Sequence, residues 1–335
     1  MVELSIVIIN YRSIDLIWNC LRSIYNSRPG ISFEITIINN EEIYTGRNPF
    51  ASEFPELRWI DMNYNAGFAR ANNTGIRSAE GGVVLLLNPD TIIPPGSLDN
   101  CYRKFINTEF VACGVQLLNE DGSTQISGNY FYRGGLNYLL PLPFTGPFIK
   151  AMGKLFSAKV PHLAKATEVD EVDWINGAFL MVKKVAIQKA GLMDEDFFLY
   201  AEEAEWCSRL KKSGKLCIFG DVKVYHLQGV SANETFASEG KGYYNLSDRK
   251  GRQIIVSNLV RIRKQYGIGW FLLILVAYTL TIPVFLLGMI VSLILPASRR
   301  KYRFSDYFGF VDNVFYIWSL SLKIISNKPY FYKVL

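Results

Sequence analysis

The stretch Val83–Thr91, VVLLLNPDT, dictates the central element of this chain. Five consecutive aliphatic residues without a polar residue among them are typical of a strand that is buried on both faces of a parallel sheet. Asn88 ends this strand, and an Asn-Pro-Asp turn places the carboxylate of Asp90 directly after it. These residue types also form ordinary turns. In a parallel sheet, however, the carboxyl end of a strand is where ligands bind, so the stretch predicts both a sheet and a candidate site.

Strands and helices alternate along the chain before this stretch. Leu4–Asn10 and Phe33–Ile38 repeat the buried-strand pattern, and Leu57–Asp61 is a weaker third strand. Apolar residues recur at helical spacing in Ile14–Tyr25 and Phe68–Ser78. This alternation predicts an α/β fold with a doubly wound, mostly parallel sheet.

Polar residues end the other predicted strands. The first strand runs into Asn10 and Tyr11, and the second runs into Asn39. Because the carboxyl ends of parallel strands lie at one edge of a sheet, we expect these side chains to gather near Asp90.

The segment NAGFARANN, residues 65–73, lies where a helix begins. Free N–H groups at a helix N-terminus favour an anion, which makes Asn65, Gly67 and Asn72 candidates for binding phosphate. A helix cap with a packing face of small residues is the alternative, and both interpretations stay open at this point.

Six acidic residues lie within Asp194–Glu205. If a helix begins near Ala201, then Glu202, Glu205 and Arg209 share one face, whereas Glu203 points elsewhere. Acidic residues in a first turn also suit the helix dipole, so a structural role is the alternative here.

Two further motifs have candidate roles. Residues 173–178, DWINGA, include Trp174, Gly177 and Ala178 and precede a buried apolar stretch. His226, one of two histidines, follows a predicted strand. A histidine at a strand end is more often a hydrogen-bonding group than a ligand, although imidazole commonly binds transition metals.

Composition excludes several classes of protein. The 335 residues are 50% hydrophobic and only 20% charged, which excludes disordered and low-complexity chains. The five cysteines form no CxxC pair, so we expect reduced thiols in a cytosolic compartment. The N-terminus, MVELSIVIINYR, has no basic region and too short an apolar run for a signal peptide.

The net charge of +6 is unevenly spread. Residues 249–335 contain 13 basic and 2 acidic residues, which gives +11 and leaves −5 for residues 1–248. Residues 267–298 contain no charged residue and no histidine, and basic clusters flank them. About 20 apolar residues are enough to cross a bilayer. We therefore predict a catalytic domain at 1–248 and a basic, helical, membrane-associated region at 249–335.

The topology of this apolar segment has two interpretations. Basic residues at both ends favour a monotopic anchor with both ends in the cytoplasm, formed by a partly inserted hairpin that breaks at Pro283. A single tilted span is the rival. Phe304–Ile325 is predicted to be an interfacial helix. Residues 129–160, rich in aromatic residues, Gly and Pro, are predicted to be an insertion that faces the membrane and helps to admit the acceptor.

Taken in order, these segments resemble family 2 of the glycosyltransferases, which have the GT-A fold, and within it the bacterial branch that contains rhamnosyltransferases. The resemblance covers about residues 4–265, and the order of its seven blocks is more specific than any one block. The blocks are SIVIINYRS, ITIINN, NYNAGFARANNTGI, LLLNPDT, WINGAFLM, MDEDFFLYAEEAEWCSRLKKSG and VYHLQGVS.

The resemblance implies an inverting, metal-dependent transfer of a sugar from a nucleotide donor to a hydroxyl of a lipid-linked glycan in surface polysaccharide synthesis. It implies dTDP-rhamnose as the first donor and UDP-sugars as the next, at the cytoplasmic face of the membrane. We expect no nucleic-acid partner, and the sequence predicts no oligomeric state.

The resemblance also assigns roles to residues. Asp90 and His226 would hold Mg²⁺ or Mn²⁺, and Glu203 would be the general base, with Glu202 beside it. Asn39 stands where the family usually has an aspartate that contacts the nucleobase. The predicted donor-binding residues are Asn10, Tyr11, Asn39, Asn65, Gly67, Asn72, Asn88 and Asp90; the predicted substrate residues are Trp174, Gly177, Ala178, Glu205 and Arg209.

Two other functions are compatible with parts of the sequence. A catalytically weak, membrane-bound partner could bind a nucleotide-sugar within a polysaccharide assembly complex. A sugar nucleotidyltransferase would need a glycine-rich phosphate loop near the N-terminus, and VIINYRS has no glycine.

Overall fold

The computed structural model describes residues 2–27, 29–42, 48–155, 162–163, 165–227, 245–296 and 300–334. The chain forms two compact units. The first comprises Met1–Tyr130, His162–Phe198 and Glu202–Ser231, and the second comprises Phe131–Pro161, Leu199–Ala201 and Ala232–Leu335. The basic region predicted from Arg249 onward belongs to the second unit, which also takes in most of the predicted insertion. A boundary at residue 248 stays a prediction, because residues 228–244 lie outside the described ranges, as does part of the insertion.

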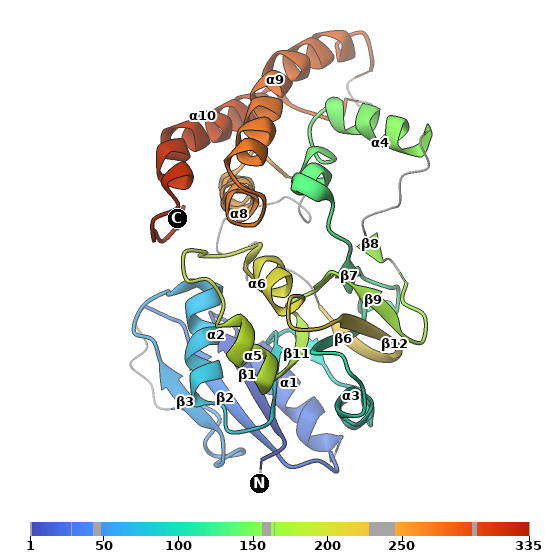
Figure 1. The fold of residues 1–335 in the computed structure, drawn as a ribbon, viewed down its shortest axis with the longest axis vertical. Helices are drawn as coiled ribbons and strands as arrows, with labels where there is room; N and C mark the ends of the chain where they lie inside the picture. Colours follow the sequence, from blue (N-terminus) through green and yellow to red (C-terminus); the bar gives the residue numbers. More distant parts are fainter. Residues whose placement is uncertain are drawn as a thin grey trace. The chain divides into compact units, whose positions relative to one another are not determined.

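A mixed sheet forms the centre of the first unit (Figure 1). Its strand order is β3-β2-β1-β4-β11-β6-β12-β5, with β9 beside β12. Strands β3, β2, β1 and β4 are parallel to one another, and β6 is parallel to β12. Only β11 of the inner strands runs the other way, between β4 and β6. The bounds are β1 (Leu4–Asn10), β2 (Phe33–Asn39), β3 (Arg58–Asp61), β4 (Val83–Leu87), β5 (Thr91–Ile92), β6 (Ala112–Leu118), β9 (Asp170–Val172), β11 (Phe179–Lys183) and β12 (Leu216–His226).

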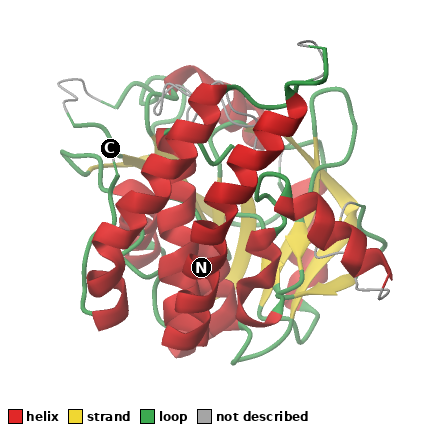
Figure 2. Cartoon of the chain, turned by 90° about the horizontal axis from the view of Figure 1, so that it is seen from above, coloured by secondary structure: helices red, strands yellow, loops and turns green. Residues whose placement is uncertain are grey.

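The expected α/β class with a mostly parallel sheet is confirmed. All residues of β1 and β4 are buried, as their unbroken apolar runs predict. Amphipathic helices supply the rest of the core, and the strands and helices can be followed in Figure 2. These helices are α1 (Ile14–Asn26), α2 (Gly67–Ser78), α3 (Ser97–Ile106), α5 (Lys184–Ala190) and α6 (Glu202–Leu210). A small second sheet contains β7 (Gly128–Asn129), β8 (His162–Leu163) and β10 (Trp174–Ile175) in the order β10-β7-β8.

Helices dominate the second unit. They are the 3₁₀ segment η1 (Arg133–Leu139), α4 (Thr145–Leu155), α8 (Arg249–Tyr266), α9 (Ile268–Ser292) and α10 (Phe304–Ser326). Aromatic contacts join α9 to the middle of the chain: the ring of Phe144 lies 5.9 Å from that of Phe285 and packs on Gly288, where a Cβ atom would come within 2.6 Å of it. The predicted insertion therefore packs on the apolar helix.

The predicted break at Pro283 is wrong. Helix α9 continues through this proline as one helix of 25 residues. The proline removes one backbone hydrogen bond, but neighbouring elements and local adjustment allow a long apolar helix to tolerate that loss. The predicted reversal of chain direction lies later, after α9 ends at Ser292 and before α10 begins at Phe304. Arg299 of the predicted basic cluster lies outside the described residues.

Candidate active site

One edge of the sheet collects most of the candidate residues. Because β1, β2, β3, β4, β6 and β12 run in the same direction, their carboxyl ends lie at this edge. The antiparallel strand β11 begins there instead, so the segment before it reaches the same edge. The sequence therefore predicted correctly that the strand-end residues gather at one edge of the sheet.

Asp90 and His226 lie side by side at this edge, as predicted. Thr91 pairs with His226 where β5 meets β12, and the backbone N–H of Leu227 donates to the Asp90 carbonyl at 2.9 Å. The Nε2 atom of His226 lies 3.3 Å from Oδ1 of Asp90 and 3.3 Å from Nδ2 of Asn88. Both side chains of the Asp90–His226 pair are buried.

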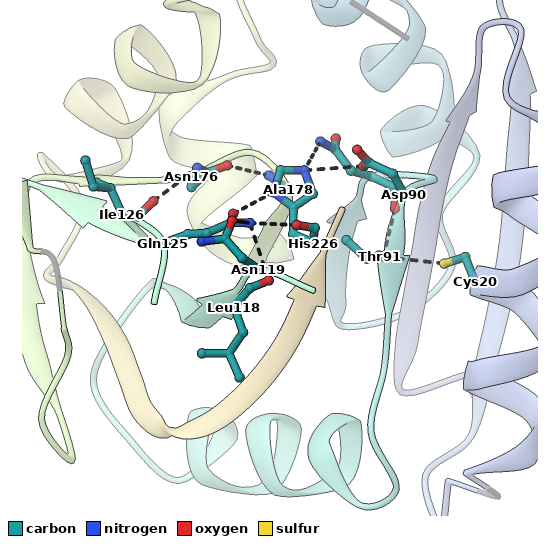
Figure 3. A network of polar contacts seen from close by, with 11 residues as sticks. Cys20, Asp90, Thr91, Leu118, Asn119, Gln125, Ile126, Asn176, Ala178 and His226 are labelled. Atoms are coloured by element: carbon teal, nitrogen blue, oxygen red, sulfur yellow. Dashed lines mark hydrogen bonds and ion pairs between the residues drawn. The ribbon is translucent and has the colours of Figure 1, made fainter. Parts of the chain in front are cut away.

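Gln125 holds the imidazole in place (Figure 3). Its Nε2 donates to the backbone oxygen of His226 at 2.6 Å and to Oδ1 of Asn119 at 2.8 Å. The amide is therefore oriented with Oε1 toward His226 Nδ1, 2.9 Å away. Nδ1 must then donate its hydrogen, which leaves the lone pair on Nε2, facing Asp90.

The Asp90–His226 pair fits a divalent cation. A carboxylate oxygen and an unprotonated imidazole nitrogen at this separation are ligands that Mn²⁺ accepts, and Mg²⁺ accepts the carboxylate. Within the described part of the chain no three His, Cys, Asp or Glu residues form a metal-binding group. An ion here would thus complete its coordination with substrate oxygens and water, as Mg²⁺ often does with phosphates.

An open pocket of about 500 Å³ borders His226. The turn after β6 lines it with Asn119, Glu120 and Asp121, and Leu227 completes the wall. The carboxylate of Asp121 accepts hydrogen bonds from Ser123 N and Oγ, which stabilises the turn. The pocket gives a polar molecule access to the imidazole side of the site.

A chain of side-chain hydrogen bonds crosses the first three strand ends. Asn10 Nδ2 donates to Asn39 Oδ1 at 2.7 Å, and Asn39 Nδ2 donates to Asp61 Oδ1 at 2.8 Å. Asn10 also donates to Glu41 Oε1 at 3.0 Å, whereas Tyr11 lies beside the Arg12 guanidinium. The sequence did not predict a role for Asp61, although it ends a strand at the same edge.

The N-terminus of α2 is not an open anion site. The N–H groups of Ala66, Gly67 and Phe68 donate to Asn40 Oδ1, Asn65 Oδ1 and the Phe198 carbonyl at 2.8, 3.1 and 2.8 Å. Of the two interpretations left open, these contacts favour the cap over free N–H groups. Gly67 is required by this arrangement: its φ is +74°, and a Cβ atom would lie 2.3 Å from Phe198 O.

Asn72 is also engaged within the helix. It is buried, and its Nδ2 donates to the Phe68 carbonyl at 3.1 Å. The alternative interpretation of a cap and packing face is the one that these contacts favour for Asn65 and Asn72. A contact of either residue with a donor stays a prediction.

Glu202 and Glu203 lie in the first turn of α6, and both are buried. Burial, and after it the charge of Glu203, raise the pKa of Glu202 well above its ordinary value. The Oε2 atom of Glu202 has no hydrogen-bond partner among the described residues. Protonation of Glu202 removes both the cost of burying its charge and the repulsion from the carboxyl group of Glu203.

Gly177 lies between Glu203 and the turn that carries Asn88 and Asp90. A Cβ atom on Gly177 would lie 3.6 Å from Cζ of Phe68 and 3.7 Å from Cγ of Glu203, which are ordinary van der Waals distances, so the glycine leaves room for about one methyl group beside these two side chains. The neighbouring Ala178 accepts a hydrogen bond from Asn88 N through its carbonyl at 3.0 Å. Trp174 is buried, and its Nε1 has no partner within the described chain. The DWINGA motif thus lies between the predicted base and the strand that carries Asp90.

Glu205 and Arg209 bind each other. Two hydrogen bonds of 2.8 and 2.7 Å join Arg209 Nε and Nη2 to the Glu205 carboxylate, and Nη1 donates to the Ala190 carbonyl at 2.6 Å. Such a bidentate pair fixes α6 against the end of α5. Contact of these two residues with substrate stays a prediction.

Gln125 is the residue that the sequence did not identify. It lies in no recognisable motif, and 101 positions separate it from His226. Its place in the turn region between β6 and β7, at the carboxyl end of β6, is the one signal that could have drawn attention to it.

An open α/β sheet with polar side chains at the carboxyl ends of its strands is typical of the class of α/β proteins that bind a ligand there. A sequence model described as "Glycosyl transferase family 2" matches residues 5–159. This match covers just under half of the chain, and the matched segment is similar to glycosyltransferase family 2.

Three proteins illustrate what the chain is similar to. The "Low-salt glycan biosynthesis hexosyltransferase Agl10" of Haloferax volcanii is 26% identical over 63% of this chain, and the match spans 62% of that relative, less than two thirds of its length. The "N-acetylglucosaminyl-diphospho-decaprenol L-rhamnosyltransferase" of Mycobacterium tuberculosis is 26% identical over 58% of this chain and 68% of its own. The crystal structure of GalNAc-T7 with UDP, GalNAc and Mn²⁺ superposes with a TM-score of 0.49 at 14% identity, over 81% of this chain and 56% of that one.

Proposed function

We propose that this enzyme transfers a sugar, with rhamnose favoured, from a nucleoside diphosphate donor to a hydroxyl of a lipid-linked glycan, with inversion. One observation carries the proposal: the Asp90–His226 pair and the space beside Gly177 that Glu203 borders both lie near the start of β11. A cation site for a diphosphate and a carboxylate for a hydroxyl thus lie at the same sheet edge.

The leaving group needs charge stabilisation. Departure of a nucleoside diphosphate builds negative charge on oxygen, which a bound divalent cation neutralises without proton transfer. Asp90 and His226 would hold that ion, and Gln125 keeps the imidazole lone pair directed toward it. Asn88 Nδ2, which donates to this same lone pair, would give up that contact when the ion binds.

The acceptor hydroxyl needs a base. Glu203 is the proposed base, because its side chain borders the space that Gly177 leaves, together with the ring of Phe68. Glu202 is proposed to stay protonated, which removes a like charge from the neighbourhood of Glu203. No covalent intermediate on the protein is needed for inversion.

The lipid-linked acceptor draws support from a relative and from the second unit. The mycobacterial relative is named for a diphospho-decaprenol acceptor. In this chain α9 and α10 are both long and apolar enough to cross a membrane. The exposed face of α9 is apolar throughout: Ile268, Leu272, Leu273, Val276, Leu280, Val284, Leu287, Ile290 and Val291.

A monotopic attachment explains both helices better than a span. Contacts between Trp318 and Thr279 and between Phe310 and Phe285 show that α10 runs antiparallel to α9 at the same level. Asp312, near the middle of α10, is exposed and forms an ion pair with Arg252 of α8. A charge at the bilayer centre is costly, so we propose that both helices lie in the membrane interface at its cytoplasmic face.

A donor panel tests the transfer. Release of nucleoside diphosphate is measured with dTDP-rhamnose and UDP-sugars, with Mn²⁺ or Mg²⁺, and with or without a lipid-linked acceptor. We expect release that depends on both the metal and the acceptor. A protein that binds donors but releases nothing with any of them would instead be a catalytically weak partner.

Proteolysis tests the attachment. In sealed inverted vesicles the cytoplasmic face points outward, so a tag after Leu335 should be digested. A protected tag would show that the chain crosses the bilayer and would overturn the monotopic arrangement.

A further inference from the structure

A buried arginine in the second unit has no anionic partner. Arg261 of α8 is 3% exposed, and no carboxylate forms an ion pair with it in the part of the chain that the structure describes. Its Nη1 donates to the hydroxyl of Tyr138, and its guanidinium lies 4.4 Å from the centre of the Phe131 ring. Buried charges in proteins are normally paired, so this environment is incomplete for a cation.

The atoms without partners lie next to one another along the helix. Arg261 Nε is buried with no acceptor, and Gln265 Oε1 is buried with no donor, again among the described residues. Arg261 and Gln265 are four positions apart and therefore share one face of α8. The contact with the Phe131 ring occupies no N–H group, so the fork of the guanidinium keeps donors for an oxyanion.

The position of Arg261 along the chain indicates the kind of anion. Helix α8 ends at Tyr266, and the apolar helix α9 begins at Ile268, two turns beyond Arg261. In the interfacial arrangement proposed above, the junction between α8 and α9 lies at the depth of the lipid phosphates. The aromatic residues Phe131 and Tyr138 come from the segment that also packs on α9, where Gly134 approaches Trp270.

We propose that Arg261, assisted by Gln265, binds a phosphoryl group carried on a lipid, and that the diphosphate of the lipid-linked acceptor is this group. This inference rests on the proposed function for the identity of the acceptor. The guanidinium forms charge-assisted hydrogen bonds to phosphate oxygens, and Gln265 contributes the donor Nε2, with its acceptor Oε1 turned away from the phosphate. The second unit would thereby hold the acceptor by its charged group as well as by its lipid.

Binding measurements on the full chain in detergent test the site. EDTA is present, so that no divalent ion at Asp90 and His226 contributes. The probes are farnesyl diphosphate, inorganic pyrophosphate, farnesol and phosphatidylglycerol vesicles. We expect farnesyl diphosphate to bind most tightly and farnesol to bind weakly; tighter binding to the vesicles would assign the site to bulk headgroups instead of the acceptor.

Variants of two arginines on the same helix separate a site from general charge. Arg261→Met should weaken farnesyl diphosphate binding by about tenfold or more, because a charged hydrogen-bond donor is lost. Arg249→Met removes an exposed cation from the same helix and should change binding less than twofold. Equal binding by wild type and Arg261→Met would overturn the proposal and leave Arg261 as a packing residue.

Two further variants guard against loss of folding. Gln265→Leu should weaken binding by a few-fold, and Arg261→Lys, which keeps the charge, should bind better than Arg261→Met. If neither variant changes binding in a folded protein, the proposal is wrong. Asp90→Asn should bind farnesyl diphosphate like wild type while losing donor turnover, so failure of this site and failure of the proposed function give different results.

Discussion

Two acidic regions of the first unit differ in how their polar atoms are satisfied. Around Asp90 the neighbouring groups are fixed by hydrogen bonds, and Gln125 directs the His226 ring. Around Glu202 a carboxyl group is buried, lies beside a second carboxyl group and leaves one oxygen without a hydrogen-bond partner among described residues. In the first region the hydrogen bonds fix one arrangement of the side chains, which suits the cation proposed above. In the second region burial and the neighbouring carboxyl group favour the protonated form of Glu202.

The largest expected effect tests the second region. Glu203→Gln removes the proposed base and should lower turnover by about 10²–10⁴-fold, the usual contribution of general base catalysis. Metal-dependent donor binding, measured by calorimetry, should stay within about twofold of wild type because Asp90 and His226 are intact. Turnover near the wild-type rate would move the base to another residue.

The next effect tests the first region. Asp90→Asn removes a charged ligand and should lower turnover by about 10²–10³-fold, a loss typical of removing one group that stabilises developing charge. Unlike Glu203→Gln, it should also weaken Mn²⁺ binding in the presence of donor, followed by electron paramagnetic resonance. His226→Gln is the matched variant and should weaken the same binding. Unchanged Mn²⁺ affinity in both variants would show that the cation binds elsewhere.

A smaller effect tests why the first region is rigid. Gln125→Met removes the acceptor of Nδ1–H and should weaken Mn²⁺ binding by about 10–100-fold, as for other groups that orient a ligand. The ¹⁵N spectrum of the imidazole gives an independent measurement, because a His162→Gln background leaves His226 as the one histidine.

In that background, wild-type Gln125 should give the signature of a proton on Nδ1, and Gln125→Met should give a mixture of tautomers. Gln125→Glu keeps an acceptor and should restore the Nδ1–H signature. If Gln125→Met shows the wild-type tautomer, Gln125 does not position the ring.

The smallest effect is on stability. A carboxyl group whose pKa is raised by folding stabilises the native state fully below its ordinary pKa of 4.5, and this contribution is lost as the pH rises through the raised pKa. Glu202→Gln cannot ionise and avoids the loss. We expect it to be more stable than wild type at pH 7 by about 1 kcal/mol, the scale that a shift of one pKa unit sets.

The two proteins should have similar stability at pH 4. Thermal unfolding across this pH range measures the difference, which is about 2–4 °C in Tm for a unit of this size. A Glu202→Gln variant that is less stable than wild type at pH 7 would show that Glu202 is ionised and paired in the native protein.

The sequence predicted those parts of the site that depend on strand ends. Asn10, Asn39 and Asp90 follow buried apolar runs, and parallel pairing then brings them to one edge. Gln125 could not be predicted, because its role depends on a tertiary contact to a distant histidine. Glu205 and Arg209 show a different limit: charges four residues apart on a helix look alike whether they bind a substrate or each other.

The second unit shows a similar contrast. The apolar character of residues 267–298 was recognisable from the sequence. The continuation of α9 through Pro283 was not, because a proline favours a break in a water-exposed helix but not in an apolar environment. The packing of Phe144 on Gly288 could not be predicted either, since nothing local in the sequence links the insertion to α9.

The direction of β11 has a consequence for how such an enzyme can change. Strand β6 leaves the sheet at the edge that holds the site, and β11 enters the sheet at that same edge. The stretch between Leu118 and Phe179 therefore departs from and returns to one rim, and within it only β9 adds to the main sheet. Parts of this stretch other than β9 and Gln125 can change in length without shifting the register of β6 and β11, so new acceptors can be accommodated there while Gln125 keeps His226 in place.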